Sequence, residues 1–400
     1  MKSSFSRRSF LRDSALFAGA ASLPLPVLAR AERQTAPVAT AAGVLPPVVE
    51  IGSNEHPDGP SPAALQAIAA ISPRGGRYLH DIQLELLAEL SQQLGVGMDS
   101  LMPYAGSTEP LDYTVLAFTS PQRSLVTANP SYEQSWHAAG RNGAAVHKVL
   151  LRKDGSHDVQ AMCGKDANAG VIYICNPNNP TGSVTARKDI EYALAHKPKG
   201  CVLVLDEAYI HFADSPVSGI DLVAAGEDVV VLRTFSKLYG MAGIRLGYAA
   251  ARPQLLAKLK FYSINSLPVT AAAAGLASLR DPQLVPIRRA RNRLLREDVA
   301  GWLTAKGYVC SPSESNCFMV DVKQPAQDFI EAMASHGVIV GRSWEGFPTQ
   351  SRITVGNAEE MTRFKQAFVQ VEAGKRGPYP LLERHRLAEH FVGQTGMPIA

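Results

Sequence analysis

Short apolar runs without polar alternation fill the middle of the chain. They are rich in Val, Ile and Leu and cover residues 125–128, 144–151, 171–175, 201–205 and 229–232. Runs of this length and composition are typical of strands that are buried on both faces of a sheet. Most of the segments between them are long enough to form crossover helices. The pattern therefore predicts an α/β fold with a mainly parallel sheet.

Helical spacing of apolar residues precedes this region. Ser61 and Pro62 open an apolar-periodic stretch that reaches Ile71, and these residues suit an N-cap and a first helical position. A second periodic stretch covers 81–94 and is followed by Gly95, which favours the end of a helix. We therefore expect two helices before the first buried strand.

The pattern changes after about residue 285. Residues 288–303 resemble a basic amphipathic helix, and residues 316–322 and 352–355 resemble strands of a smaller α+β domain. We predict a small domain formed by 48–80 and 286–374, a large domain over 81–285, and a C-terminal extension over 375–400.

The first residues have the pattern of an export signal. The pair Arg7 and Arg8 is followed by Phe10-Leu11, by a mostly apolar run over 15–29 and by an Ala-x-Ala cleavage pattern over 29–31. Together these features are typical of a twin-arginine signal peptide. The alternatives are a membrane anchor and a basic tail. An anchor needs ~20 apolar residues, which is more than this run provides.

We therefore predict a signal peptide over 1–31 and a linker over 32–47. The mature protein would begin near Glu32 and lie in a bacterial periplasm. The twin-arginine export machinery would be a partner, and no stable membrane anchor is expected.

Charge and cysteine content narrow the classes of function. The formal net charge is +4, but the first 31 residues hold five basic residues and one acidic residue, so the remainder has 35 of each sign. Such a balance does not favour a nucleic-acid partner. The five cysteines form no C-x-x-C pair, so we predict no metal site and no disulfide framework.

Three polar motifs follow predicted strands. The run ending at Cys175 leads into Asn-Pro-Asn-Asn-Pro-Thr-Gly over 176–182, and the run ending at Leu205 leads into Asp-Glu-Ala-Tyr over 206–209. The third run leads into Thr-Phe-Ser-Lys over 234–237 and then a Gly-rich turn. Open α/β sheets bind their ligands at the carboxyl ends of strands, so these motifs are expected to share one site.

With these motifs the chain resembles the fold type I pyridoxal 5'-phosphate (PLP) aminotransferases of class I/II, and within them the histidinol-phosphate aminotransferase group. The resemblance runs from about Pro46 to about Phe368. It also includes Asn-Glu-His-Pro-Asp-Gly-Pro-Ser over 54–61, Arg-Tyr over 77–78 and Gly-Ser-Thr-Glu over 106–109. It implies a PLP cofactor, a large domain with a mainly parallel sheet and a smaller α+β domain.

Lys237 and Asp206 are the predicted catalytic residues. A transaminase needs a lysine that attaches the cofactor as a Schiff base and then moves a proton, and Lys237 fits both roles. A carboxylate beside the pyridine nitrogen keeps that nitrogen protonated, and Asp206 is the candidate. The alternatives are a surface lysine and a helix-capping aspartate.

The cofactor phosphate needs N–H groups at a helix start, together with hydroxyl groups and an arginine. Gly106, Ser107 and Thr108 precede a helical stretch and are expected to provide the first of these. By the resemblance, Ser236 and Arg245 provide the others.

The resemblance assigns four further side chains to the cofactor. Asn179 and Tyr209 would hydrogen-bond the ring oxygen, and Tyr132 would stack on the ring. Tyr78 would reach the phosphate from a neighbouring subunit, which implies a homodimer with shared active sites. The alternatives are that Asn179 only forms a turn and that Tyr132 is a core residue.

Arg352 matches the anion-binding arginine of the family and would hold a substrate carboxylate or phosphate, assisted by Asn316. Its alternative is a surface salt bridge. The chain departs from the pattern at Gly341, where many members have an arginine. Arg342 follows one position later and is the candidate for the second anion contact, although a shift of one residue along a strand reverses the direction of a side chain. Asp58 stands where some members have a tyrosine near the substrate, and an acid there would disfavour a phosphate.

We therefore predict a PLP-dependent aminotransferase. It would move an amino group between an L-amino acid or related amine, with histidinol phosphate among the candidates, and a 2-oxo acid. One alternative is another PLP reaction on the same site, such as that of a lyase, decarboxylase or amino-acid oxidase. The other alternative is an exported protein that binds the cofactor without catalysis.

Overall fold

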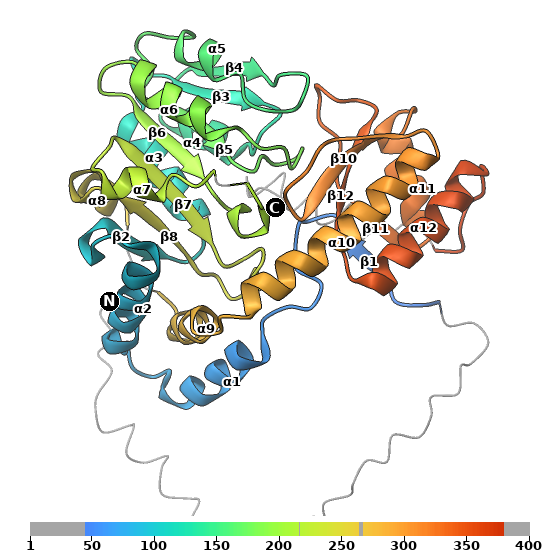
Figure 1. Ribbon diagram of the computed structural model, residues 1–400, viewed down its shortest axis with the longest axis horizontal. Helices are drawn as coiled ribbons and strands as arrows, with labels where there is room; N and C mark the ends of the chain where they lie inside the picture. The colour runs from blue at the N-terminus through green and yellow to red at the C-terminus, as the bar shows by residue number, and fades with distance from the viewer. Residues whose placement is uncertain (1–44, 216, 264–266, 380–400) are drawn as a thin grey trace, which may run out of the picture. The chain divides into compact units, whose positions relative to one another are not determined.

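A seven-stranded, mainly parallel sheet forms the centre of the protein in the computed structural model, which describes residues 45–215, 217–263 and 267–379 (Figure 1). The strand order is β2-β8-β7-β6-β5-β3-β4, and β8 runs antiparallel to both of its neighbours. The bounds are β2 Leu101–Tyr104, β3 Leu125–Asn129, β4 Val146–Leu150, β5 Val171–Cys175, β6 Val202–Asp206, β7 Val229–Thr234 and β8 Gly247–Ala251.

Helices cover both faces of this sheet. Successive residues of the central strands belong to different hydrophobic cores, as Leu203 and Val204 of β6 do, because side chains alternate across a strand. One face packs against α2 His80–Leu94, α5 Val159–Cys163, α6 Arg187–His196, α7 Ile220–Ala224 and α9 Val269–Leu279. The other packs against α3 Thr108–Phe118, α4 Gln134–Arg141 and α8 Pro253–Lys260.

The helix-end signals of the sequence are confirmed in α1 and α2. Helix α1 covers Pro62–Ile71, and the Ser61 hydroxyl accepts a hydrogen bond from the Ala64 N–H at 3.2 Å. Helix α2 ends at Gly95, which takes a left-handed conformation with φ of 67°. Within the described ranges, three short 3-10 helices cover Ser72–Arg74, Met98–Ser100 and Ile210–Phe212.

Two small sheets lie beside the large one. A parallel pair joins β1 Val49–Ile51 to β11 Val338–Val340, and an antiparallel sheet has the order β12-β10-β9. Its strands are β9 Val309–Cys310, β10 Cys317–Asp321 and β12 Gln350–Thr354. They share one core with α10 Leu284–Ala305, α11 Ala326–Ser335 and α12 Ala358–Glu372 (Figure 1).

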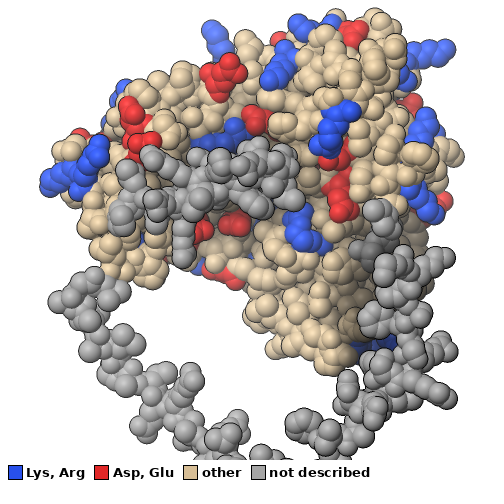
Figure 2. All heavy atoms as spheres, turned by 180° about the vertical axis from the view of Figure 1, so that it is seen from behind, with Lys and Arg blue, Asp and Glu red and all other residues tan. Residues whose placement is uncertain are grey.

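The structure confirms the predicted fold class, and all five apolar runs form strands of the large sheet. The predicted domain bounds stay a prediction, and the predicted signal peptide and most of the linker lie outside the described residues. In the part of the chain that is described, no helix has the length and apolar character needed to cross a membrane. Basic and acidic side chains lie among one another on the face shown in Figure 2.

Candidate active site

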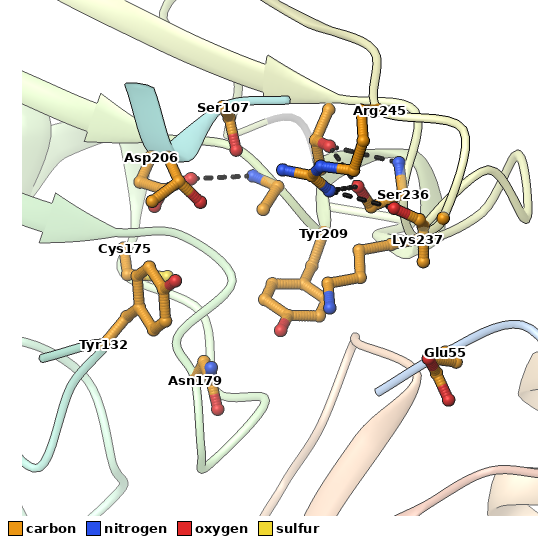
Figure 3. A pocket seen from close by; sticks show the side chains of 15 residues that line it. Glu55, Ser107, Tyr132, Cys175, Asn179, Asp206, Tyr209, Ser236, Lys237 and Arg245 are labelled. Carbon is orange, nitrogen blue, oxygen red and sulfur yellow. Dashed lines mark hydrogen bonds between the residues drawn. The ribbon is translucent and has the colours of Figure 1, made fainter. Parts of the chain in front are cut away.

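A cavity of about 270 Å³ lies at the carboxyl ends of β5, β6 and β7 (Figure 3). Each of these strands ends in a residue that lines it. The lining residues are Glu55, Ser107, Thr108, Tyr132, Cys175, Asn179, Asp206, Ala208, Tyr209, Thr234, Ser236, Lys237, Ala242, Gly243 and Arg245. The cavity therefore brings together most of the site residues that the sequence predicted.

Lys237 extends into this cavity from the turn after β7, beside the Tyr209 ring (Figure 3). Its side chain is buried, so the surface alternative is wrong. Burial, followed by the positive charge of Arg352, lowers the pKa of Lys237 to about 8. A lowered pKa provides the neutral amine that attacks a carbonyl carbon at moderate pH.

Asp206 is the last residue of β6 and is buried at the base of the cavity. Its Oδ2 accepts a hydrogen bond from the Tyr173 hydroxyl at 2.8 Å, and its Oδ1 accepts one from the Ala208 N–H at 3.2 Å. Burial raises the pKa of Asp206 to about 6. The next helix, a 3-10 turn, begins at Ile210 after Tyr209, so Asp206 does not cap it.

A cradle for an anion forms where α3 begins. Ser107 is the N-cap residue, but its side chain makes no capping hydrogen bond, so the hydroxyl is available to a ligand. Gly106 has φ of 95°, and a Cβ on it would lie 2.1 Å from Arg245 Nη2. A Cβ on Gly247 would lie 2.7 Å from the Ser107 nitrogen. The two glycines thus let the helix start and the Arg245 guanidinium approach each other, as a phosphate site requires.

Three further polar side chains, those of Tyr209, Tyr132 and Asn179, also line the cavity. The Tyr209 hydroxyl accepts a hydrogen bond from Asn54 Nδ2 at 2.9 Å and retains its own proton for donation. Burial raises the pKa of Tyr132 to about 12, so this tyrosine also stays protonated. Asn179 has its Oδ1 bound to Arg352, and its amide nitrogen can still donate.

Arg352 lies on β12, next to the cavity. Its Nη1 donates to Asn179 Oδ1 at 2.8 Å and its Nη2 donates to the Gly52 carbonyl at 2.5 Å. Because the side chain is buried, the alternative of a surface salt bridge is wrong. Asn316 is also buried, and its Nδ2 donates to the Asn54 carbonyl at 3.0 Å. Asn316 therefore supports the backbone beside Glu55.

Six residues that the sequence associated with substrate or cofactor are not among those that line the cavity: Gly106, Arg352 and Asn316, described above, and Arg342, Tyr78 and Asp58. Arg342 forms an ion pair with Glu133, with 2.6 Å between Nη2 and Oε2. Tyr78 is 74% exposed, as a residue that serves a neighbouring subunit would be. Asp58 pairs with Arg291 at 2.6 Å instead of facing the cavity, so the expected acid beside the substrate is not Asp58.

Glu55 lines the cavity as a second acid besides Asp206, and it was not predicted from the sequence. It lies within the opening motif over 54–61, so the motif was a signal that could have identified it. The negative charge of Glu55 acts on Lys237 and opposes the lowering of the lysine pKa. Figure 3 shows Glu55 on a separate segment of the chain from Lys237.

Known proteins match this chain over most of its length. The family model "Aminotransferase class I and II" matches residues 46–368. Histidinol-phosphate aminotransferase of Bacillus subtilis (strain 168) is 34% identical over 320 residues, 78% of this chain and 88% of that enzyme. The enzyme of the same name from Symbiobacterium thermophilum is 36% identical over 333 residues, 80% and 90% of the two chains. The structure of histidinol-phosphate aminotransferase from Sinorhizobium meliloti, in complex with PLP, is 25% identical with a TM-score of 0.75, and the match covers 81% and 90% of the chains.

Fold and site thus define a fold type I PLP-dependent transferase. The chain belongs to the aminotransferase class I and II family. It is a PLP-dependent transaminase, and the alternative of a protein without catalysis is set aside.

The cavity suits PLP on its own geometry, because it joins a buried amine, a buried carboxylate and an anion cradle in one space. When bound, PLP withdraws electrons from the carbon that carries the amino group. Lys237 would hold the cofactor and move a proton at its Nζ, and Asp206 would keep the ring nitrogen protonated. Ser107, Ser236 and Arg245 would hold the phosphate.

Proposed function

We propose that this transaminase takes its amino group from an L-amino acid or related amine, that Arg352 binds the carboxylate of the donor, and that a 2-oxo acid is the acceptor. The supporting observation is the buried guanidinium of Arg352, fixed by Asn179 and Gly52 directly beside the cavity. A fixed guanidinium fork matches the two oxygens of a carboxylate.

Charge around the site favours a carboxylate over a phosphate dianion. The charge of Arg342 is offset by its ion pair with Glu133, and Glu55 adds a negative charge to the cavity wall. Glu55 also suits a donor whose far end is cationic or donates a hydrogen bond. Basic and aromatic amino acids are therefore included among the donors to be tested.

Histidinol phosphate is the second candidate donor. Relatives that are 34% and 36% identical are histidinol-phosphate aminotransferases. The sequence suggested that Asp58 would repel a phosphate, but Asp58 is paired with Arg291 and does not line the cavity. The offset charge of Arg342 still argues for the carboxylate.

A panel of donors tests the proposal. We expect kcat/KM for at least one carboxylate donor to equal or exceed the value for histidinol phosphate. The Arg352→Ala variant should raise KM for the best donor by roughly 10- to 100-fold, because charged hydrogen bonds contribute about 1.5–3 kcal/mol each. Steady-state kinetics measure both, and formation of pyridoxamine phosphate from donor alone distinguishes transamination from the other PLP reactions.

Arg293→Ala is the matched control, since Arg293 forms an exposed pair with Asp214 away from the cavity lining. Its KM should match that of the unmodified enzyme. A strong preference for histidinol phosphate would refute the carboxylate proposal, and an unchanged KM in Arg352→Ala would remove Arg352 from the site.

We also propose a homodimer in which Tyr78 reaches the active site of the partner subunit. The Tyr78 ring stacks on His80 with 5.9 Å between centroids but is 74% exposed. This exposure supports the role, because a large aromatic ring usually buries most of its surface against other groups. Analytical ultracentrifugation measures the mass in solution, and a monomer that is fully active would contradict the proposal.

We further propose twin-arginine export to the periplasm. The arginine pair, the apolar run and the cleavage pattern support it, and so does the family match, which begins only at residue 46. The signal lies outside the described residues. Export of folded protein suits an enzyme that acquires its cofactor in the cytoplasm.

Replacing Arg7 and Arg8 with lysine should keep the protein in the cytoplasm and uncleaved, because the recognised arginine pair is lost. Cell fractionation and N-terminal sequencing measure the location and the first residue. Arg12→Lys is the control and should still be exported. A natural protein found only in the cytoplasm, starting at residue 1 or 2, would disprove export.

A further inference from the structure

The segment that follows β11 places an indole ring against two arginines. Trp344 is 5% exposed, and the guanidinium carbon of Arg342 lies 4.4 Å from the centroid of its ring. The guanidinium carbon of Arg352 lies 5.4 Å from the same centroid. Both distances are within the range of cation–π attraction. The indole therefore contacts the side chain that we assign to the substrate carboxylate.

Arg342 also contacts a residue of the large domain, Glu133. Arg342 Nη2 lies 2.6 Å from Glu133 Oε2, and both side chains are partly exposed, at 40% and 26%. Glu133 directly follows Tyr132, which lines the cavity, and stands at the start of α4. The ion pair thus connects the segment after β11 to the cavity wall.

The structure leaves no room for a side chain at position 341, where the sequence has glycine. Its N–H donates to the Arg352 carbonyl at 2.8 Å, and a Cβ on it would lie 2.9 Å from the Cβ of Arg352. A side chain at 341 would therefore collide with Arg352. Arg342, the next residue, also lies outside β11, and its side chain meets Glu133.

We propose that Glu133, Arg342 and Trp344 form a bridge that positions Arg352, and that Arg342 does not bind substrate itself. This inference rests on the proposed function, in which Arg352 binds the donor carboxylate. Two guanidinium groups on one indole repel each other, and the Glu133 carboxylate offsets that repulsion. Because Arg342 is held in the bridge, Arg352 alone of these two arginines binds the anionic group of the donor. One guanidinium group suits a singly charged carboxylate better than a phosphate dianion.

A double-mutant cycle on the ion pair tests the bridge. Glu133→Gln and Arg342→Gln should each raise KM for the best carboxylate donor by roughly three- to tenfold, while kcat stays within about twofold, because a loosened Arg352 weakens binding and leaves the reacting groups in place. The double variant should be no worse than either single variant. The visible spectrum of the bound cofactor should not change in any of them.

The charge-reversed pair Glu133→Arg with Arg342→Glu should recover most of the lost affinity, since it restores an ion pair in the opposite sense. Trp344→Leu should also raise KM, because the ring between the two guanidinium groups is lost. Glu372→Gln is the matched control: it breaks the Lys306–Glu372 pair, which has a similar distance of 2.8 Å and exposures of 32% and 27%.

The outcomes separate the alternatives. If Arg342→Gln raises KM while Glu133→Gln leaves it unchanged or lowers it, Arg342 binds substrate directly and the bridge is refuted. Additive effects in the double variant, or unchanged KM in both single variants, also overturn the bridge. In each of these cases a raised KM in Arg352→Ala keeps the proposed function intact, whereas an unchanged KM there refutes the proposed function itself.

Discussion

Replacing Lys237 with alanine is expected to abolish both the visible absorption of lysine-bound PLP and the transaminase activity. Lys237 provides the buried amine in the cavity, and its pKa of about 8 makes that amine available for attack. Loss of a positioned proton carrier alone costs about 10²- to 10⁴-fold in rate. Loss of the covalent attachment adds to this, so kcat should fall by at least roughly 10⁴-fold.

Absorption spectroscopy and steady-state kinetics measure the two effects. Lys165→Ala is the control, because Lys165 is exposed and lies outside the cavity lining. It should retain the spectrum and the activity of the natural enzyme. Near-normal turnover in Lys237→Ala would show that another group carries out this chemistry.

Asp206→Asn should retain PLP but lose most of its activity. The amide has nearly the same shape and can still accept the hydrogen bond from Tyr173, but it has no charge to hold the ring nitrogen protonated. A change of two units in the pKa of that nitrogen corresponds to about 100-fold. We therefore expect kcat to fall by roughly 100-fold or more while PLP still absorbs in the visible range.

Comparison with the Asp206→Asn variant also tests how the stability of the cofactor-free protein depends on pH. Burial raises the pKa of Asp206 above its unfolded value, to about 6, so the protonated form is favoured in the folded protein without cofactor. Its contribution to stability is present below the unfolded pKa and is lost as the pH rises through about 6. The cofactor-free natural protein should thus lose thermal stability between about pH 4 and pH 7 relative to Asp206→Asn. A melting temperature difference that does not depend on pH would contradict the burial argument.

The sequence predicted the central strands because their signal is local. Strands β5, β6 and β7 are buried along their whole length and begin with at least four consecutive residues that are apolar or aromatic, so composition alone identifies them. Strand β8 was missed because Gly-Tyr-Ala-Ala-Ala has low strand propensity. The close approach of Gly247 to Ser107 requires such small residues, and that contact is visible only in three dimensions.

The candidate site also has a part that could be predicted from the sequence and a part that could not. Lys237, Asp206 and the residues of the anion cradle lie at or next to the ends of strands, where the sheet topology brings them together. The pairing of Arg342 with Glu133 depends on residues 209 positions apart, for which one sequence contains no signal. The same is true of the pairing that draws Asp58 away from the cavity. The roles of Lys237, Asp206 and the cradle residues in binding cofactor stay predictions, which the variants test.

The pairing of β1 with β11 has a consequence for the order of folding. Val49 lies opposite Val338, and the Asn54 N–H donates to Thr354 Oγ1 across 300 residues of sequence. Closing so long a loop has an entropic cost, and contacts of this range slow folding. Glu55 and the Gly52 carbonyl that holds Arg352 take their places only when this pairing forms. A nascent chain can therefore assemble the central sheet early, but the substrate side of the cavity is completed only after the residues up to Thr354 have left the ribosome.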